Sequence, residues 1–441
     1  MAKKVKVQSV TDSNITSPVV FTDANGVAVI QSGKTRYTVE VKGEKSEGAE
    51  VSLLKDGRVK VKFSADVGKK NHTVTVTDGK GNAVEDFVVS EDILEVRNLK
   101  KYFPLTRSLF GKVLSSLKAV DDVSFTLEEG TTIGVVGESG CGKTTLGRTI
   151  LKLYDSDGGK IYFDGDDITD LKRSEMIKYR TDIQLIFQDP YSSLPPRMTV
   201  GNIIAEAVRV HNIVPKSEIK NYVHKIMKQC GLQRHYYDRY PHEFSGGQRQ
   251  RICIARALAV KPKLVICDEP VSALDVSIQA QIINLLKKLQ KTEGLTYVFI
   301  SHDLSVVKYI TDKIMVMYLG NVMETGETDE IFDNPLHPYT KALFSAVPVP
   351  DPDVKMDRII LGGDIPSPAN PPEGCKFHTR CNQCMNVCKF KQPQYIEHVK
   401  GHFVACHLYD EEVMSHLDRY EKEYRELLAA KEQEEKNEKE K

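Results

Sequence analysis

Alternating apolar and polar positions dominate the first 91 residues of the chain. The runs at 35–41, 58–63 and 72–77 place an apolar side chain on every second residue, and turn-forming residues separate them. This period of two is typical of strands that bury one face. The pattern predicts a small β-sandwich-like module of roughly immunoglobulin type over residues 1–91.

One short motif, Thr-Asp-x-x-Gly-x-Ala-Val, occurs twice in this module, at 22–29 and at 77–84. Asp followed by Gly favours a tight turn between strands. The two copies are either an internal repeat or two similar hairpin turns. Nothing in the module suggests catalysis, and its only histidine is His72. It is interpreted either as a docking or regulatory domain or as a passive fused domain, of natural or engineered origin.

Residues 92–345 follow a different pattern, in which short apolar runs alternate with longer helical patterns. The runs at 132–136, 263–267 and 296–301 are almost continuously apolar. Such runs are typical of parallel strands that are buried on both faces, with helices as connections. The segment is therefore expected to be an α/β domain.

The last hundred residues divide into two parts. Residues 346–408 begin with many prolines, which predicts a linker or a tightly turning extension, and continue into a cysteine-rich stretch. Residues 409–441 have no Gly or Pro and are rich in Glu and Lys, which predicts a charged helical tail. Its apolar positions are spaced as in a heptad repeat: Val413, Leu417, Tyr420, Tyr424 and Leu427. Two heptads are too few for a coiled coil, so the helix is expected to lie on its own protein.

Composition narrows the classes of protein to consider. The 441 residues include 61 Lys+Arg and 61 Asp+Glu, so the net charge is zero, and 40% of residues are hydrophobic. This is an ordinary globular composition, and the neutral balance argues against a general nucleic-acid binder. No apolar run is long enough to cross a membrane, and no apolar run follows the basic first residues. The chain is expected to stay in the cytosol.

A phosphate-binding loop follows the apolar run at 132–136. The sequence matches G-x-x-x-x-G-K-[ST], and the residues are Gly137, Glu138, Ser139, Gly140, Cys141, Gly142, Lys143, Thr144 and Thr145. The glycines let backbone N–H groups close around phosphate oxygens, and a helical pattern follows. Lys143 is expected to neutralise phosphates, and the Thr144 hydroxyl is expected to ligate Mg²⁺.

Two further segments carry candidate chemistry. Asp268 and Glu269 end the apolar run at 263–267, where Asp268 can hold Mg²⁺ and Glu269 can polarise an attacking water. A second anion site is indicated before an amphipathic helix, at Ser245, Gly246, Gly247 and Gln248. Taken alone, this last segment is equally well explained as a helix start capped by Ser245.

Together these motifs resemble the ATP-binding-cassette family, specifically the nucleotide-binding subunit of a transporter. The resemblance covers about 92–345, and the signature starts with Phe244 where the family usually has Leu. By resemblance, Gln188 is the Q-loop residue, Asp275 lies in the D-loop, His302 is the switch histidine, and Phe103, with Tyr102 as a neighbouring candidate, stacks on adenine. The resemblance implies a P-loop NTPase fold with a RecA-like core and antiparallel-β and α-helical subdomains.

The family mechanism then implies roles for these residues. Two cassettes dimerise head to tail, with each ATP between one P-loop and the partner's signature. Glu269 is the implied general base, His302 holds the γ-phosphate, and Thr144, Gln188 and Asp268 hold Mg²⁺. Because both catalytic residues and the signature are present, a scaffold with an inactive cassette is not favoured. A soluble cassette protein acting on nucleic acid or the ribosome is a further alternative, but the chain has no long heptad array.

Three segments, 188–194, 275–281 and 337–343, resemble ATPase subunits of oligopeptide and dipeptide importers of the OppF/DppF type. Nickel or another small solute is the alternative cargo. The implied partners are a second ATPase of the OppD/DppD type or a copy of this chain, two integral-membrane permease subunits, and indirectly an extracytoplasmic solute-binding protein. No nucleic acid is implied. The implied location is the cytoplasmic face of the cell membrane, as a peripheral subunit.

The cysteine-rich extension resembles the tail of the same subfamily, which in some members binds a [4Fe–4S] cluster. The matching ligands are Cys375, Cys381, Cys388 and Cys406, and Cys384 is an additional thiol. Four thiolates are the usual ligand set of such a cluster. Zinc is the competing metal, because Cys381 and Cys384 have zinc-like spacing and His378, His402 and His407 lie close in sequence. Reduced cysteines without any metal are the third interpretation.

Overall fold

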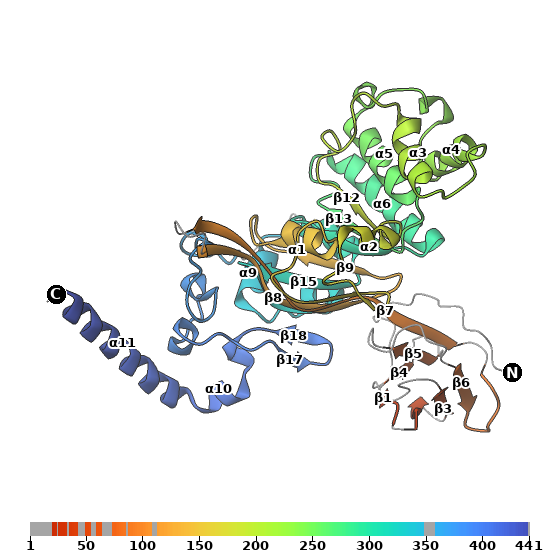
Figure 1. The fold of residues 1–441 in the computed structure, drawn as a ribbon. Coiled ribbons are helices and arrows are strands. Elements are labelled where there is room, and N and C mark those ends of the chain that lie inside the picture. Colours follow the sequence, from red (N-terminus) through yellow and green to blue (C-terminus); the bar gives the residue numbers. More distant parts are fainter. Residues whose placement is uncertain are drawn as a thin grey trace, which may run out of the picture. The chain divides into compact units, whose positions relative to one another are not determined.

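The computed structural model describes residues 20–23, 25–32, 35–42, 49–53, 59–63, 73–84, 87–107, 113–347 and 358–439. These residues form two compact units, each described by itself below (Figure 1). The first unit contains the described residues up to Leu99, together with Asp122–Gly134 and Gly147–Asp312. The second contains Lys100–Asp121, Val135–Leu146 and the described residues from Lys313 onward. No helix within the described ranges is both long and apolar enough to cross a membrane.

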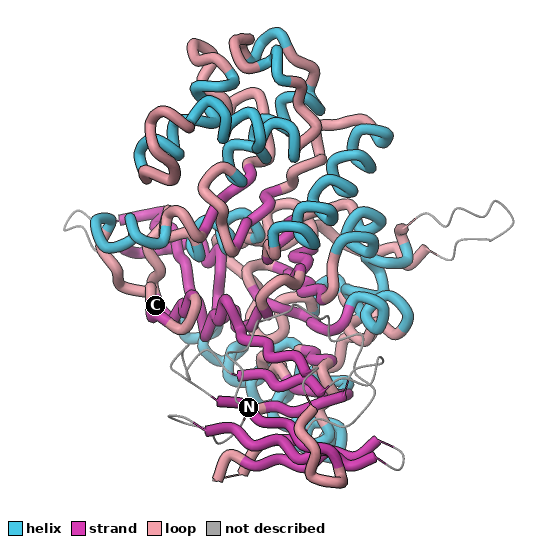
Figure 2. The backbone as a smooth tube through the Cα atoms, turned by 90° about the vertical axis from the view of Figure 1, so that its right-hand side faces the viewer, coloured by secondary structure: helices cyan, strands magenta, loops and turns pink. Residues whose placement is uncertain are grey.

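The N-terminal part of the first unit is all β-structure (Figure 2). Its strands are β1 (Val20–Phe21), β2 (Val27–Ser32), β3 (Thr35–Lys42), β4 (Glu50–Leu53), β5 (Val59–Phe63), β6 (Thr73–Asp78) and the start of β7 (Phe87–Arg107). One sheet has the order β2-β3-β6, and a second begins β1-β4-β5-β7. Buried Val, Ala and Ile side chains from both sheets form one core. The predicted small all-β domain is confirmed, and the three predicted alternating runs correspond to β3, β5 and β6.

The repeated motif forms the same turn at both places. The Asp23 Oδ1 atom accepts hydrogen bonds of 2.9 Å from the backbone N–H groups of Asn25 and Val27. Asp78 Oδ1 likewise accepts 2.9 Å bonds from two backbone N–H groups, at Lys80 and Asn82. In each turn a glycine adopts positive φ, 74° at Gly26 and 82° at Gly81, which only glycine adopts without strain. The similar local sequence therefore specifies a similar local turn.

Strand β7 crosses the predicted boundary at 91/92 without a break. Its first residues pair in parallel with β5, from Val59↔Phe87 to Phe63↔Glu91, and further along it joins β10 (Gly158–Phe163), which pairs with β11 (Asp166–Asp167). Strand β8 (Val113–Glu128) also pairs with β7. The composition changes near residue 91, but the strand does not end there.

A parallel sheet forms the centre of the first unit. Strands β12 (Ile183–Ile186), β13 (Leu264–Asp268) and β14 (Thr296–Ile300) pair in parallel, and the start of β9 (Thr132–Val136) follows β14 in the sheet order. Every residue of β9, β13 and β14 is buried. The α/β fold that the apolar runs predict is therefore confirmed. The carboxyl ends of three neighbouring parallel strands lie at one edge of this sheet.

Helices make up most of the remaining first unit (Figure 1). Helix α5 (Gly246–Leu258) packs against β12 and against α3 (Val200–Val210) and α4 (Ile219–Gln229), which form the helical subdomain implied by the resemblance. The other helices of the unit are α2 (Arg173–Met176), α6 (Val276–Glu293), α7 (Leu304–Ile310) and the second half of α1 (Lys143–Ile150). Short 3₁₀ turns lie at η3 (Ile177–Tyr179), η4 (Arg234–Tyr236) and η5 (Pro241–Glu243).

The second unit is built on the end of β9 and a run of antiparallel strands. The sheet order is β9-β15-β16-β18-β17, with β15 (Lys313–Tyr318), β16 (Asn321–Glu327), β17 (Ile396–Val399) and β18 (His402–Val404). Helices α8 (Thr328–Asp333) and α9 (Pro338–Ser345) follow β16. The cysteine-rich extension adds the 3₁₀ turns η6 (His378–Arg380), η7 (Asn386–Lys389) and η8 (His407–Tyr409). The extension thus contributes two strands to the unit's own sheet.

The C-terminal tail is helical, but it forms two helices where the sequence predicts one. Helix α10 (Glu411–Ser415) ends before His416, whose backbone (φ −124°, ψ 29°) is not helical, and α11 (Leu417–Lys439) follows. The prediction that the tail lies on its own protein is confirmed near its start. Tyr420 is buried and its hydroxyl accepts a 2.8 Å bond from Lys391, while Tyr424 stacks on Phe390. Leu427 is exposed, so the contact ends before that position.

Candidate functional site

The phosphate-binding loop follows β9 in the second unit, and two of its glycines are sterically required. Gly137, Gly140 and Gly142 have φ values of 148°, 81° and 107°. A Cβ atom at Gly142 would lie 2.0 Å from the carbonyl oxygen of Ala119, and one at Gly137 would lie 2.2 Å from that of Met317. No other residue type fits at these two positions without moving the backbone. The loop then enters α1 at Lys143, which places the N–H groups of a helix start at the loop.

Lys143 is held by its own loop. Its Nζ atom donates hydrogen bonds of 2.7 Å to the Gly137 carbonyl and 3.0 Å to the Glu138 carbonyl, and the residue is only 6% exposed. The neighbouring Cys141 is buried, and burial raises the pKa of its thiol. The position of the ammonium group therefore depends on where the backbone of residues 137 and 138 lies.

The two aromatic candidates for adenine stacking lie on β7 in the same unit. The Tyr102 hydroxyl donates to Asp121 Oδ1, and Lys118 Nζ lies 5.6 Å from the centre of the Tyr102 ring. Phe103 has Lys101 Nζ 5.3 Å from its ring centre. Both rings are half-buried, so each leaves part of its face open. The geometry therefore retains both as candidates.

Three predicted site residues come together in the first unit, one after each of the parallel strands β12, β13 and β14. Gln188 Nε2 donates a 2.8 Å hydrogen bond to Glu269 Oε2, and His302 Nδ1 lies 3.2 Å from the same oxygen. Asp268, the last residue of β13, is buried at 2% exposure and pairs in register with Ile300. The sheet topology gathers these side chains because the carboxyl ends of parallel strands share one edge.

Glu269 has an unusual backbone. Its φ is 46°, in the left-handed region that side chains other than Gly, Asn and Asp rarely adopt. Its N–H donates a 3.0 Å bond to the Ile300 carbonyl, which holds the residue against the end of β14. Strain of this kind is retained where surrounding contacts fix it, and it is common at functional sites. The strained turn directs the Glu269 carboxylate toward Gln188 and His302.

The Ser245–Gln248 segment begins α5 with a capping box. Gln248 N–H donates to Ser245 Oγ at 3.4 Å, and Ser245 N–H donates to Gln248 Oε1 at 3.1 Å. Gly247 packs on Ile278, since a Cβ atom there would lie 2.4 Å from Ile278 Cγ2. Ser245 and Gly246 are exposed. The cap and the anion-site interpretations are therefore compatible, because the helix start is both ordered and open.

Asp275, the D-loop candidate, is the N-cap of α6. Its Oδ1 atom accepts bonds of 3.1 Å from the Ile278 N–H and 2.9 Å from the Ser277 hydroxyl. The carboxylate is therefore already used to start a helix. Any role in nucleotide binding has to be compatible with this cap.

The cysteines of the extension lie near one another. The Cys375 N–H donates a 2.8 Å bond to the Cys388 carbonyl. Burial, together with neighbouring cysteine thiols, raises the pKa of both Cys375 and Cys406 to about 12. Burial also raises the pKa of Cys388 to about 11. The donor set suits a thiolate-ligated metal, yet among the described side chains no three Cys, His, Asp or Glu are arranged to hold a metal ion.

The three histidines considered as zinc ligands are engaged elsewhere. His402 Nε2 lies 2.7 Å from Glu324 Oε1, and His407 Nε2 lies 2.9 Å from the Lys391 carbonyl oxygen. His378 Nδ1 lies 2.9 Å from the Cys375 carbonyl oxygen. Each contact occupies one ring nitrogen, and a ligating histidine also uses its second nitrogen in this way, so these contacts do not separate zinc from an iron–sulfur cluster.

Sequence reasoning missed the contacts of the Glu138 side chain. Arg380 Nη1 and Nη2 donate to its two carboxylate oxygens at 2.7 and 3.1 Å. The Tyr339 hydroxyl accepts a 2.9 Å bond from the Glu138 N–H. The only sequence signal is that Arg380 directly precedes Cys381 in the extension. Nothing in either motif indicates that the two segments meet.

Comparisons with known proteins relate the chain to one family of transport proteins. The family model described as "ABC transporter" matches residues 120–272, and the model described as "Oligopeptide/dipeptide transporter, C-terminal region" matches residues 323–388. The oligopeptide transport ATP-binding protein AppF of Bacillus subtilis is 54% identical over 72% of this chain and 98% of its own length. The oligopeptide transport ATP-binding protein OppF of Salmonella typhimurium is 51% identical over 71% of this chain and 95% of its own length. The solved structure of cbiO1 from Clostridium perfringens is 30% identical, covers 55% of this chain and 91% of that chain, and has a TM-score of 0.48.

The chain therefore belongs to the ATP-binding-cassette transporter family, among the ATP-binding proteins of its oligopeptide/dipeptide group. It carries the ATPase domain of that family. Strands β1–β6 of the N-terminal all-β module lie outside the residues that the two family models match.

Proposed function

We propose that this protein binds and hydrolyses ATP to power the import of peptides through a membrane-embedded permease. The observation that carries the proposal is the meeting of Gln188 and His302 at one oxygen of Glu269, at the carboxyl ends of three neighbouring parallel strands. The two contacts orient the Glu269 carboxylate at this sheet edge, which makes it the candidate proton acceptor for the attacking water. The names of the relatives, oligopeptide transport ATP-binding proteins, support a peptide cargo.

The P-loop is the proposed phosphate site. Backbone N–H groups of residues 137–145 and the Lys143 ammonium bind the phosphates, and Phe103 or Tyr102 stacks on the adenine. Thr144, Gln188 and Asp268 are the proposed ligands of Mg²⁺, which when bound neutralises charge on the phosphates. The loop fits this role, because its positive-φ glycines leave no side chain in the way of the N–H groups.

Glu269 is the proposed general base, and its neighbours determine when it can act. Its Oε2 atom is engaged by Gln188 and faces His302 in the structure described. Accepting a proton at Oε2 requires that Gln188 and His302 exchange these contacts for others. We propose that Gln188 turns to Mg²⁺ and His302 to the γ-phosphate, which leaves Glu269 to hold the attacking water.

The signature segment acts on a second cassette in this proposal. The exposed start of α5, at Ser245 and Gly246, is presented to ATP bound by a partner in a head-to-tail dimer, together with Gly247, Gln248 and Asp275. The partner is a second ATPase subunit or a copy of this chain. The dimer serves two integral-membrane permease subunits and, through them, an extracytoplasmic solute-binding protein. The proposed location is the cytoplasmic face of the membrane, as a peripheral subunit.

The test is the substitution Glu269→Gln, which keeps the shape of the side chain but removes the proton acceptor. ATP turnover should fall by at least about 100-fold while ATP binding persists, and ATP should hold the dimer together. Glu206→Gln is the matched control, because Glu206 is an exposed carboxylate on α3. Unchanged turnover in Glu269→Gln contradicts the proposal. Uptake of labelled oligopeptides or nickel by cells carrying each variant identifies the cargo.

We also propose that the extension holds a [4Fe–4S] cluster through Cys375, Cys381, Cys388 and Cys406. Cys375 and Cys388 are buried, and the thiols of the extension lie near one another, which supports the cluster. Protein purified without oxygen should be brown and contain iron and sulfide. Cys388→Ser should remove the iron while Cys384→Ser retains it. A colourless protein with stoichiometric zinc would reject the cluster.

A further inference from the structure

We propose that Arg380 is a positioning residue for the nucleotide-binding loop, which it holds through Glu138. The inference rests on the proposed ATPase function but concerns a residue outside every nucleotide motif. Both residues lie in the second unit, and 242 positions separate them. The cysteine-rich extension would thus influence ATP binding through the loop.

The ion pair has the geometry of a strong one. Arg380 presents two N–H donors to the two Glu138 oxygens, at 2.7 and 3.1 Å. The Arg380 side chain is 8% exposed and that of Glu138 is 25% exposed, so solvent screens the pair only partly. The hydrogen bond to Glu138 is the main reason why the pKa of Arg380 lies above its usual range. A bidentate pair fixes orientation as well as distance.

The backbone of Glu138 is held as firmly as its side chain. Its N–H donates to the Tyr339 hydroxyl at 2.9 Å. Tyr339 belongs to a fully buried aromatic group with Tyr318 and Phe377, in which ring centres lie 4.8 to 5.3 Å apart. Arg380 Nη1 also donates to the Tyr318 hydroxyl at 3.5 Å. Residue 138 therefore has one polar partner for its amide and one for its carboxylate, and both belong to the same packed group.

Lys143 transmits this constraint to the phosphate site. Its Nζ atom donates to the Gly137 and Glu138 carbonyls, so a shift of residue 138 moves the ammonium as well. Lys143 is the residue expected to neutralise phosphates. Arg380 therefore acts on the nucleotide through Glu138 and does not need to contact it.

Close backbone contacts hold the turn of the extension that carries Arg380. Arg380 ends η6, and the N–H of His378 donates a 3.1 Å bond to the Cys375 carbonyl within the same turn. The chain enters this turn through Gly374, where φ is 61° and a Cβ atom would lie 2.4 Å from the Cys388 carbonyl oxygen. These close backbone contacts fix the base of the Arg380 side chain.

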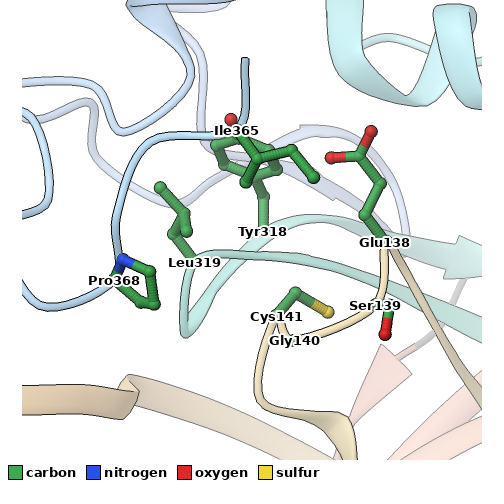
Figure 3. Close-up of a pocket in the computed structure, with 8 residues that line it drawn as sticks. All are labelled: Glu138, Ser139, Gly140, Cys141, Tyr318, Leu319, Ile365 and Pro368. Carbon is green, nitrogen blue, oxygen red and sulfur yellow. The ribbon is translucent and has the colours of Figure 1, made fainter.

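The extension also covers one side of the loop. A small cavity of about 80 Å³ lies between Glu138–Cys141, the end of β15, and Ile365 and Pro368 of the extension (Figure 3). Figure 3 shows the Glu138 carboxylate and the Ser139 hydroxyl pointing in opposite directions from the loop. The carboxylate is thus paired on its own side and is kept away from the direction in which Ser139 points.

Charge gives the pair a second effect. The loop binds a polyanion, and an unpaired carboxylate at position 138 would repel it. Arg380 neutralises that carboxylate and fixes it. Loss of Arg380 should therefore weaken ATP binding in two ways, by loosening the backbone and by exposing a negative charge.

The experiment measures ATP affinity directly, by equilibrium binding of ATP–Mg²⁺ to the full-length protein. Arg380→Gln should raise the Kd for ATP about tenfold, as expected for loss of a partly buried bidentate pair. The KM for ATP should rise in parallel, while kcat at saturating ATP changes by less than about twofold, because chemistry lies with other residues. Arg380→Lys, which keeps the charge but not the fork, should give an intermediate Kd.

A second substitution separates positioning from general damage. In the Arg380→Gln background, Glu138→Gln removes the unpaired charge and should recover part of the lost affinity. Arg425→Gln on α11 is the matched control, since Arg425 is exposed, and it should bind ATP as the unaltered protein does. If Arg380→Gln binds ATP with the same Kd as Arg425→Gln, the proposal is overturned. It is also overturned if Arg380→Gln has a lower kcat for ATP hydrolysis while its Kd for ATP is unchanged. Because binding is measured without peptide or permease, failure of the transport function would leave this result interpretable.

Discussion

Gln188 donates a hydrogen bond from its Nε2 atom to Oε2 of Glu269, 2.8 Å away, although 81 positions separate the two residues. The bond joins the residue after β13 to the loop after β12. It engages the oxygen that the proposed general base would use. In the structure described, the proposed general base is therefore already engaged by a hydrogen bond.

Replacing Gln188 with Ala should lower kcat for ATP hydrolysis by about 10- to 100-fold, because the amide both orients Glu269 and is a proposed Mg²⁺ ligand. His302→Ala should act in the same direction. Steady-state ATPase assays at saturating ATP–Mg²⁺ measure the effect. Gln229→Ala is the control, since Gln229 makes an equivalent 2.8 Å bond to Glu293 elsewhere in the unit. Equal kcat for Gln188→Ala and this control would remove Gln188 from the site.

Gly142→Ala should abolish ATP binding, because the added Cβ atom would lie 2.0 Å from the Ala119 carbonyl oxygen and would force the loop to move. Gly363→Ala is the control, because it introduces backbone strain without a steric clash. Gly363 also has positive φ, 73°, but nothing lies within 4 Å of its added Cβ. The control should cost only about 1 kcal/mol of stability and leave the Kd for ATP unchanged. Normal ATP binding by Gly142→Ala would show that the loop adapts freely.

The buried His337 should make stability depend on pH between about 4 and 6.5. Burial, opposed by the nearby Glu324 and assisted by Lys341, lowers its pKa to about 4. The neutral ring is also what the fold needs, because Nδ1 accepts a 3.0 Å bond from the Tyr339 N–H at the start of α9. The unfolded chain takes up a proton at this histidine near pH 6.5, whereas the folded protein does so only near pH 4. The stabilisation that the neutral ring provides is therefore complete above about pH 6.5 and is lost as the pH falls toward 4.

The expected loss at pH 5 relative to pH 7.5 is about 2 kcal/mol from this residue. Urea unfolding at the two pH values measures it. His337→Asn keeps an acceptor at the helix start but does not titrate. The variant should therefore lose less free energy of unfolding between the two pH values than the unaltered protein, by that amount. Identical losses for the two proteins would contradict the assignment.

Deleting residues 417–441 should lower the melting temperature of the second unit by several degrees. The deletion removes the contact of Tyr420 with Lys391 and that of Tyr424 with Phe390. Deleting only 428–441 should have little effect, since the contact ends before the exposed Leu427. Thermal unfolding followed by circular dichroism compares the two truncations. If both behave alike, α11 does not stabilise the protein on which it lies.

The elements that follow from local pattern could be predicted from the sequence. β9, β13 and β14 are short apolar runs, and the P-loop and the signature depend on residues close in sequence. Their meeting at a sheet edge follows from parallel pairing. The contact between Glu138 and Arg380 could not be predicted, because no local pattern records a pair 242 positions apart. The break at His416 could not be predicted for another reason, because neither Gly nor Pro marks it.

The uninterrupted strand β7 has a mechanical consequence. A module attached through a flexible linker can move without transmitting force until the linker is fully extended. The backbone from Phe87 to Arg107 is already an extended strand. It pairs with β5 at one end and with β10 further along. A force applied to the N-terminal module by anything that grips it would therefore load a sheet strand of the ATPase itself.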